Sequence, residues 1–219
     1  MPPAPRNKRR TRTRRPASAA EQDGHRRKRR NREVVDAAAK VFLARGYADA
    51  SVQDVADELG ILKGSLYYYI STKEDLLFWL LEEVHEDVHR ILEEVEALDG
   101  LDPLARLHEY VRRQVEYNAS NLAKISVYYH DIEQLGDERR EDIKGRRKAH
   151  ERFVTTMIKE AQARGEVDPG ADARVLANCV FAVMIWIYRW YRPGGRVKRD
   201  ELASTLADFA IGGLSSRLA

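Results

Sequence analysis

Apolar residues recur every three or four positions along most of the chain beyond residue 32, which is the spacing of one face of an α-helix. One such stripe starts at Val34 and stops at Gly46, and a longer one runs from Leu77 to Leu98. No stretch of useful length alternates apolar and polar residues, as a half-buried strand would. The pattern predicts an all-α protein of nine helices, at about residues 32–45, 52–59, 63–70, 72–98, from 103 onward, 121–135, 137–164, 172–192 and 198–211.

Capping residues mark where several of these helices begin. Ser51 has Asp54 three residues later, and Ser71 has Glu74 at the same spacing, so each pair predicts a capping box. Asp102 comes before Pro103, which is the usual order of an N-cap and the first helical residue. The second, third and fourth helices therefore follow one another with very short connections.

The second and third predicted helices have the dimensions of a helix-turn-helix motif over about residues 51–70, with a turn at Gly60. In that motif the second helix enters the major groove of DNA. A core position for three consecutive tyrosines is the alternative. Successive residues point 100° apart on a helix, however, so at least one of the three must be exposed. The predicted DNA contacts are Ser51, Lys63, Gly64, Ser65, Tyr67, Tyr68, Tyr69, Thr72 and Lys73.

These residue types have chemical reasons to contact DNA. A lysine such as Lys63 reaches a guanine edge or a phosphate, and a tyrosine hydroxyl bonds phosphate while its ring packs on a sugar or a thymine methyl group. Gly64 allows the backbone to approach closely. Lys73 stands at the start of a helix, where its charge adds to the positive helix end, so it predicts a phosphate site together with Ser51.

Charge is distributed unevenly along the chain. Residues 1–32 hold thirteen Lys and Arg against Glu21 and Asp23, a net +11, which leaves −8 for the other 187 of the 219 residues because the total is +3. Residues 1–27 have no hydrophobic face and predict a disordered basic N-terminal arm. Such arms are typical of nucleic-acid-binding proteins, and this one could enter the adjacent minor groove of DNA. A tail that only raises solubility is the alternative.

Composition restricts the remaining function classes. The single cysteine, Cys179, excludes a disulfide framework and a multi-cysteine zinc module. No apolar segment precedes a cleavage site near residue 1, so we expect a cytoplasmic protein. The longest apolar stretch, residues 175–188, is too short to span a bilayer, so we expect a buried helix and no membrane association.

The segment 51–76, SVQDVADELGILKGSLYYYISTKEDL, resembles the TetR/AcrR family of bacterial transcriptional regulators. The family pattern is matched at residues 54–56, 60–61, 63–67 and 72–74, and residues 38–47 are similar to the family's first helix. Leu62 and Ile70 depart from it, since Ser or Thr and Phe are common there. The resemblance implies a nine-helix TetR-like fold, with an N-terminal three-helix helix-turn-helix domain, in a DNA-binding regulator that is not an enzyme and needs no cofactor or metal.

The resemblance also implies how the chain is organised. We expect the arm at 1–27, a TetR-type DNA-binding domain at 28–88, and a ligand-binding and dimerisation domain at 89–219. A homodimer formed through the last two helices would act as a repressor on an inverted-repeat operator, and a small-molecule effector would release it. An activator with the same DNA-binding head is an alternative, as is a protein that coats DNA without sequence preference. The expected interface residues are Val175, Val180, Val183, Ile187, Leu202, Leu206 and Phe209.

The effector is suggested by the run YRWYRPGG at residues 188–195. It resembles a branch of the family whose members respond to CoA thioesters of fatty acids or steroid-ring fragments. CoA requires cations for its phosphates and aromatic rings for its adenine. The alternative is that these residues cap a helix end and pack the dimer. Polar residues within apolar helices add further candidates, and the predicted ligand-binding residues are His89, Tyr110, Tyr128, Asp131, Trp186 and Arg189.

One motif suggests a different chemistry. Residues 85–89 read HEDVH and satisfy the pattern H-E-x-x-H, in which His85 and His89 could bind zinc with Glu86 as general base. A zinc-dependent hydrolase is therefore an alternative function. The helix continues well past the motif, no third ligand is evident, and the acidic neighbours are typical of a solvated face.

Overall fold

The structure, a computed structural model, describes residues 19–215. Helices form throughout this range and no strand does, so the predicted all-α class is confirmed for the described residues. All nine predicted helices are present, and the eighth is divided at Trp186 into two pieces. The elements are α1 (Ala19–Arg45), α2 (Val52–Glu58), α3 (Lys63–Leu66), α4 (Lys73–Glu96), α5 (Pro103–Ser120), α6 (Leu122–Asp131), the 3-10 turn η1 (Ile132–Gln134), α7 (Asp137–Ala163), α8 (Ala173–Ile185), α9 (Ile187–Trp190) and α10 (Arg199–Ser215).

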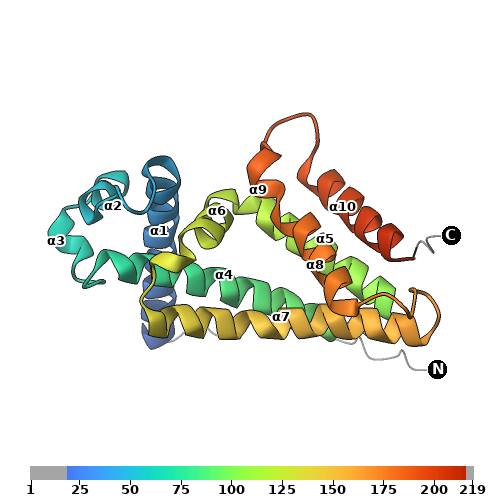
Figure 1. Ribbon diagram of the computed structural model, residues 1–219. Coiled ribbons are helices and arrows are strands. Elements are labelled where there is room, and N and C mark those ends of the chain that lie inside the picture. The colour runs from blue at the N-terminus through green and yellow to red at the C-terminus, as the bar shows by residue number, and fades with distance from the viewer. Residues whose placement is uncertain (1–18, 216–219) are drawn as a thin grey trace, which may run out of the picture.

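The helices α1, α2 and α3 form a small head at one end of the molecule (Figure 1). The long helix α4 runs from the head into a larger body, and α7 lies along it. In the body, α5 packs against α10, α8 and α7, while α6 contacts α1, α4 and α9. Helix α6 therefore connects the head to the body.

The hydrophobic core is formed by two clusters. One joins the head to the first half of α4, to α6 and η1, and to Ile143 at the start of α7. The other fills the body between α5, α7, α8 and α10. The first cluster crosses residue 88, so the head is packed onto part of the body and the predicted boundary between the two domains remains a prediction.

Helix α1 begins earlier than the sequence pattern predicted. It starts at Ala19 and not near residue 32, so residues 19–27 of the predicted disordered arm are helical; residues 1–18 of that arm lie outside the described part of the chain. Residues 19–32 hold six Arg and Lys as well as Ala19 and Ala20, and these are strong helix formers. Extending a helix that is already nucleated requires no apolar face of its own.

The capping predictions are confirmed at two helices and corrected at a third. Ser51 caps α2 with Asp54 in a capping box, and Asp102 caps α5. Helix α4 is capped by Thr72 with Asp75, one residue later than predicted. Thr72 and Asp75 have the same i, i+3 spacing as the predicted pair, and the predicted partner Glu74 instead accepts a hydrogen bond from the backbone N–H of Gly136 at the start of α7 (3.2 Å).

The apolar segment at α8 and α9 is less buried than the sequence predicted. By length and composition alone, Ala173–Trp190 could cross a membrane, although core helices of soluble proteins pass the same test. Only 28% of this segment is buried within the single chain. Val180, Ile187 and Leu202 face the chain's own core, whereas Val175 and Phe209 are 59% and 68% exposed. The expected interface set is therefore divided between the core and the surface.

Candidate functional site

The helix-turn-helix motif is fixed to the head by a few buried side chains. Val52, Val55 and Ala56 attach α2 to the core. The chain then turns at Gly60, whose φ of +65° favours glycine. Leu66 and Ile70 anchor α3 and the turn after it, with 0% and 4% of their surfaces exposed. Because these anchors occupy the inner side, the residues between them face outward.

The outward side of α3 carries most of the predicted base-contacting residues. Lys63, Gly64, Ser65, Tyr67 and Tyr68, here called the recognition surface, are all exposed. Tyr68 is 86% exposed, and the Lys63 ammonium lies 5.7 Å from the centre of the Tyr67 ring. A Cβ atom added at Gly64 would meet no atom of the protein within 4 Å. Packing within the head therefore does not require glycine here, whereas close approach of an external partner would.

Tyr69 differs from the other two tyrosines, because it is partly buried against the core of the head. Its ring packs edge-on against Tyr68, with centroids 5.5 Å apart. The structure therefore places it behind the recognition surface, supporting the orientation of Tyr68. The argument that three consecutive tyrosines cannot share one environment agrees with this arrangement, although the sequence did not indicate which one would turn inward.

Three of the predicted DNA-contacting residues, Lys73, Ser51 and Thr72, are engaged within the head. The Lys73 ammonium donates to the carbonyl oxygens of Tyr47 (2.7 Å), Ala48 (3.1 Å) and Ala50 (2.9 Å). It also lies 4.4 Å from the centre of the Tyr47 ring. An ammonium has three donors, and all three are used. In this structure Lys73 therefore fastens the loop before α2 to the start of α4, and its contact with a DNA phosphate remains a prediction.

Ser51 and Thr72 act as caps in the same way. The Ser51 hydroxyl accepts from the Asp54 N–H (3.2 Å) and donates to its carboxylate (2.7 Å). The Thr72 hydroxyl accepts from the Asp75 N–H (3.2 Å), and the Thr72 N–H donates to the Asp75 carboxylate (2.8 Å). The start of α4, where a phosphate was predicted, already holds a carboxylate. Hydrogen bonds from Arg139, Thr72 and Ser71 outweigh burial and lower the pKa of Asp75.

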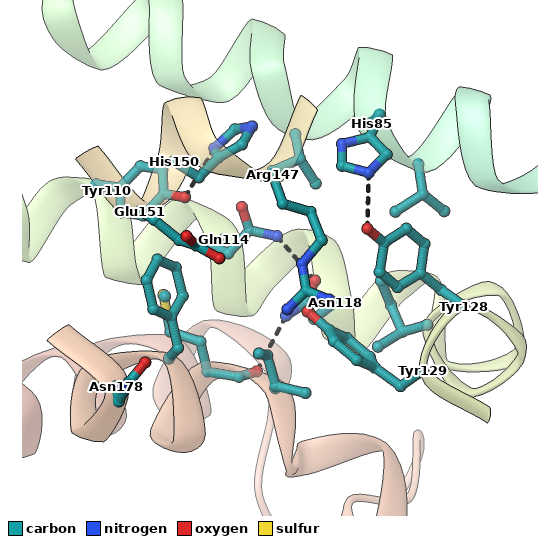
Figure 2. Close-up of a pocket in the computed structure, with 16 residues that line it drawn as sticks. His85, Tyr110, Gln114, Asn118, Tyr128, Tyr129, Arg147, His150, Glu151 and Asn178 are labelled. Atoms are coloured by element: carbon teal, nitrogen blue, oxygen red, sulfur yellow. Dashed lines mark hydrogen bonds between the residues drawn. The ribbon is translucent and has the colours of Figure 1, made fainter. Parts of the chain in front are cut away.

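The body encloses a cavity of about 120 Å³ between α4, α5, α6, α7 and α8 (Figure 2). Its wall is largely apolar, with polar side chains projecting inward from several helices. This is the composition expected of a small-molecule site. The lining is formed by Val84, His85, Val88, Tyr110, Gln114, Asn118, Ile125, Tyr128, Tyr129, Arg147, His150, Glu151, Asn178, Phe181, Met184 and Ile185.

Two histidine–tyrosine pairs occupy this wall. The Tyr128 hydroxyl is hydrogen-bonded to Nε2 of His85 (2.6 Å), and the Tyr110 hydroxyl to Nδ1 of His150 (3.1 Å). Burial lowers the pKa of His85 and of His150 to about 4, and in the same direction act His150, Arg146 and Arg147 on His85 and His89 on His150. Burial also raises the pKa of both tyrosines. All four groups are therefore neutral near pH 7, and the half-buried Arg147 is the charged side chain nearest the middle of the cavity (Figure 2).

The cavity contains only part of the predicted ligand set. Tyr110 and Tyr128 line it, whereas His89, Asp131, Trp186 and Arg189 do not. His89 is exposed and lies 3.5 Å from the Glu93 carboxylate. Sequence reasoning missed Gln114, Arg147 and His150. All three are polar residues at positions that helical spacing turns inward. That pattern could be interpreted only once the packing partners of α5 and α7 were known.

The H-E-x-x-H motif is divided by the fold. His85 lines the cavity and bonds to Tyr128, while His89 is exposed one turn further along α4. Among the described residues, no group of three or more His, Cys, Asp and Glu side chains could hold a metal ion. The motif therefore lacks a third ligand within the described range.

Two sets of ion pairs connect the body to the head. Lys124 on α6 is buried, and its ammonium lies 2.6 Å from the Asp36 carboxylate of α1 and 2.7 Å from the Glu83 carboxylate of α4. Arg139 on α7 binds the Asp75 carboxylate (2.6 Å) in the first turn after the recognition surface. The cavity wall and the head are thus joined by direct polar contacts through α6 and α7.

An exposed helix-turn-helix surface joined to a body with an internal cavity defines a DNA-binding regulator with a small-molecule site. Comparison with known proteins agrees. Residues 34–79 match the family of bacterial regulatory proteins called the tetR family, and residues 100–214 match the tetracyclin repressor-like C-terminal domain. The chain therefore belongs to the TetR family of transcriptional regulators, and the predicted family is confirmed.

Individual relatives are also transcriptional regulators. The chain is 28% identical to the HTH-type transcriptional repressor KstR2 of Rhodococcus jostii strain RHA1 over 85% of this chain and 92% of that protein. The solved structure of the ketosteroid regulator KstR2 of Mycobacterium tuberculosis has the same fold (TM-score 0.79, 24% identity, 86% and 96% covered). So has AibR in complex with isovaleryl coenzyme A and operator DNA (TM-score 0.73, 26% identity, 82% and 97% covered).

Proposed function

We propose that this protein is a cytoplasmic, homodimeric repressor that binds an inverted-repeat operator and is released by an acyl-CoA thioester. The observation that carries the proposal is the recognition surface, which exposes Lys63 on α3 and Tyr68 in the turn directly after it, where a helix-turn-helix motif meets the major groove. A regulator with this architecture performs no catalytic step and requires no metal.

A dimer accounts for the uncovered apolar face of the body. Val175 on α8 and Phe209 on α10 are exposed in the single chain, and these two helices pack on each other. A second copy placed on this face would bury both residues and would present two α3 helices to successive major grooves. The low burial of residues 173–190 has the same explanation, since a partner subunit would cover the segment in place of a membrane.

An acyl-CoA would use the cavity for its acyl group and the surface for its nucleotide. An apolar cavity of about 150 Å³ holds a benzene molecule, so 120 Å³ accommodates a short or branched acyl group but not CoA itself. From the cavity, aromatic rings lead outward: Tyr129 stacks on Tyr188, and Trp186 packs against Tyr188. At the outer end the Arg189 guanidinium lies 5.8 Å from the Trp186 ring, where cation and ring could receive phosphate and adenine. AibR, whose complex contains isovaleryl coenzyme A, supports this class of effector.

Release from DNA follows from the connections between cavity and head. Tyr128 in the cavity wall and Lys124 both lie on α6, and Lys124 is paired with Asp36 of α1. An acyl group that displaces α6 would therefore move α1 and change the spacing of the two heads in the dimer. The expected coupling between effector and operator is about 1–3 kcal/mol.

The experiment is fluorescence anisotropy on labelled DNA from upstream of the protein's own gene, with random DNA as control. We expect selective binding that isovaleryl-CoA reverses, while free CoA at equal concentration does not. Tyr68→Ala should reduce selectivity, and Glu166→Gln, an exposed change in the body, should not. Equal binding to both DNAs would contradict the assigned operator, and selective binding unaffected by a series of acyl-CoAs would contradict the assigned effector.

A further inference from the structure

The cavity wall contains a buried hydrogen-bond acceptor without a partner. Gln114 on α5 is 6% exposed, and its side-chain oxygen Oε1 is paired with no donor in the described part of the chain. Among the lining residues of the cavity, it is the one with such an atom. A buried acceptor left unpaired is unfavourable, so a ligand that supplies a donor gains affinity from this site.

The identity of the unpaired atom follows from its neighbours. The backbone carbonyl of Met184 can only accept, and the side-chain amide of Asn118 donates to it (3.0 Å). Asn118 therefore turns its own oxygen towards Gln114, whose side-chain N–H donates to that oxygen (2.9 Å). This relay, which Figure 2 shows crossing the cavity wall, leaves Gln114 with its oxygen free and not its nitrogen.

The buried hydroxyl groups nearest in kind already have partners: those of Tyr110 and Tyr128 are bonded to His150 and His85. The Arg147 guanidinium lies 5.8 Å from the centre of the Tyr129 ring. Since no side chain of the described wall donates to Oε1 of Gln114, a ligand can supply the donor. A cationic donor is disfavoured because Arg147 lines the same cavity.

We propose that the effector carries a hydroxyl group that donates a hydrogen bond to Oε1 of Gln114. The enclosed space is too small for CoA, so the hydroxyl belongs to the acyl group, and the effector class is a short hydroxyacyl thioester. This inference rests on the proposed function, because it takes the cavity as the effector site.

The test uses cyclohexanol and cyclohexanone, which share one ring but of which only the alcohol can donate a hydrogen bond. Dissociation constants for the full chain would be measured by saturation-transfer NMR. We expect the alcohol to bind about tenfold more tightly, the difference typical of one hydrogen bond. Gln114→Met should remove this preference. Gln114→Glu should retain it, because an oxygen of the introduced carboxyl group can accept the same hydrogen bond from the alcohol. Thermal midpoints would confirm that both variants fold.

Equal or tighter binding of the ketone would overturn the inference. So would an unchanged alcohol preference in Gln114→Met, or no binding of either probe at millimolar concentration. None of these results depends on DNA or CoA. A failure of acyl-CoA to release the operator therefore counts against the proposed function, while the alcohol preference is measured separately.

Discussion

The recognition surface of the head and the cavity of the body treat polar side chains in opposite ways. On α3 and in the turn after it, Lys63 and Tyr68 project into solvent, where water satisfies their polar groups until DNA replaces it. In the cavity, Tyr110, Tyr128 and their histidines pair with one another, and a single amide oxygen is left over. The exposed groups of the recognition surface are hydrated and so cost little free energy when unbound. The cavity instead selects a ligand through the one buried group that it leaves unpaired.

The comparison also separates three lysines of the protein by their roles. Lys63 is exposed, Lys73 is held by three carbonyl oxygens, and Lys124 is buried between two carboxylates. Only the first is free to meet a phosphate without breaking contacts inside the chain. A positive charge near the DNA-binding head is therefore not by itself a DNA contact, and the predictions below test this distinction.

The largest effect is expected at the junction between the two regions. Lys124→Met leaves Glu83 and Asp36 without their cation, and breaking a buried pair costs about 3–5 kcal/mol. The free energy of unfolding, measured with urea, should fall by about 3 kcal/mol because Asp36 remains partly solvated. Lys159→Met, an exposed change on α7, is the matched control and should alter it by less than about 0.5 kcal/mol. A loss as small as the control's would show that α6 is not fastened to the head by this residue.

The cavity should make stability depend on pH. His85 and His150 have pKa values of about 4 in the folded state, against 6.5 for an unperturbed histidine. The unfolded chain therefore binds more protons between those values, so stability is present above pH 6.5 and is lost as the pH falls towards 4. The loss should be about 2 kcal/mol for each histidine at pH 5 and about 3 kcal/mol below pH 4. Urea unfolding at pH 7, 6 and 5 would show it, and replacing both histidines with Phe should flatten the profile, whereas the exposed His130→Gln should not.

Lys73→Met tests whether Lys73 stabilises the head or contacts a DNA phosphate. We expect a loss of about 2 kcal/mol in unfolding free energy, since hydrogen bonds from charged groups contribute about 1.5–3 kcal/mol. Operator affinity should fall with it, but the slope of log affinity against log salt should not change. A slope reduced by about one would instead identify a lost phosphate contact. Lys63→Met is the opposite case, with unchanged stability and a direct loss of DNA affinity.

The smallest change in folding stability is expected at Tyr68, together with a clear change in operator recognition. Tyr68→Ala should leave the thermal midpoint unchanged, because the side chain is 86% exposed. It should weaken operator binding by about 1–2 kcal/mol and binding to random DNA much less. Tyr68→Phe separates the hydroxyl from the ring. Equal losses on both DNAs would mean that Tyr68 contacts only the phosphate backbone.

The head could be predicted from sequence because its determinants are local. The capping box at Ser51, the turn at Gly60 and the apolar spacing of α2 lie within twenty residues, and each acts through the backbone of its own helix. One cap was misplaced where the sequence offers two adjacent choices. Thr72 caps α4 with Asp75 in place of Ser71 with Glu74, and Glu74 instead accepts a hydrogen bond from Gly136, which is 62 residues away.

The sequence by itself determined that the chain is helical, that it carries a helix-turn-helix motif, and that it belongs to the TetR family. Tertiary structure alone decided which polar residues meet. Helical spacing places Gln114, Tyr128 and His150 on inner faces, but three separate helices must pack before these side chains share a cavity. Tertiary structure likewise decided that Lys73 is held by backbone carbonyl groups and that Tyr69 turns inward. Periodicity states which side of a helix is buried, and only packing states what it is buried against.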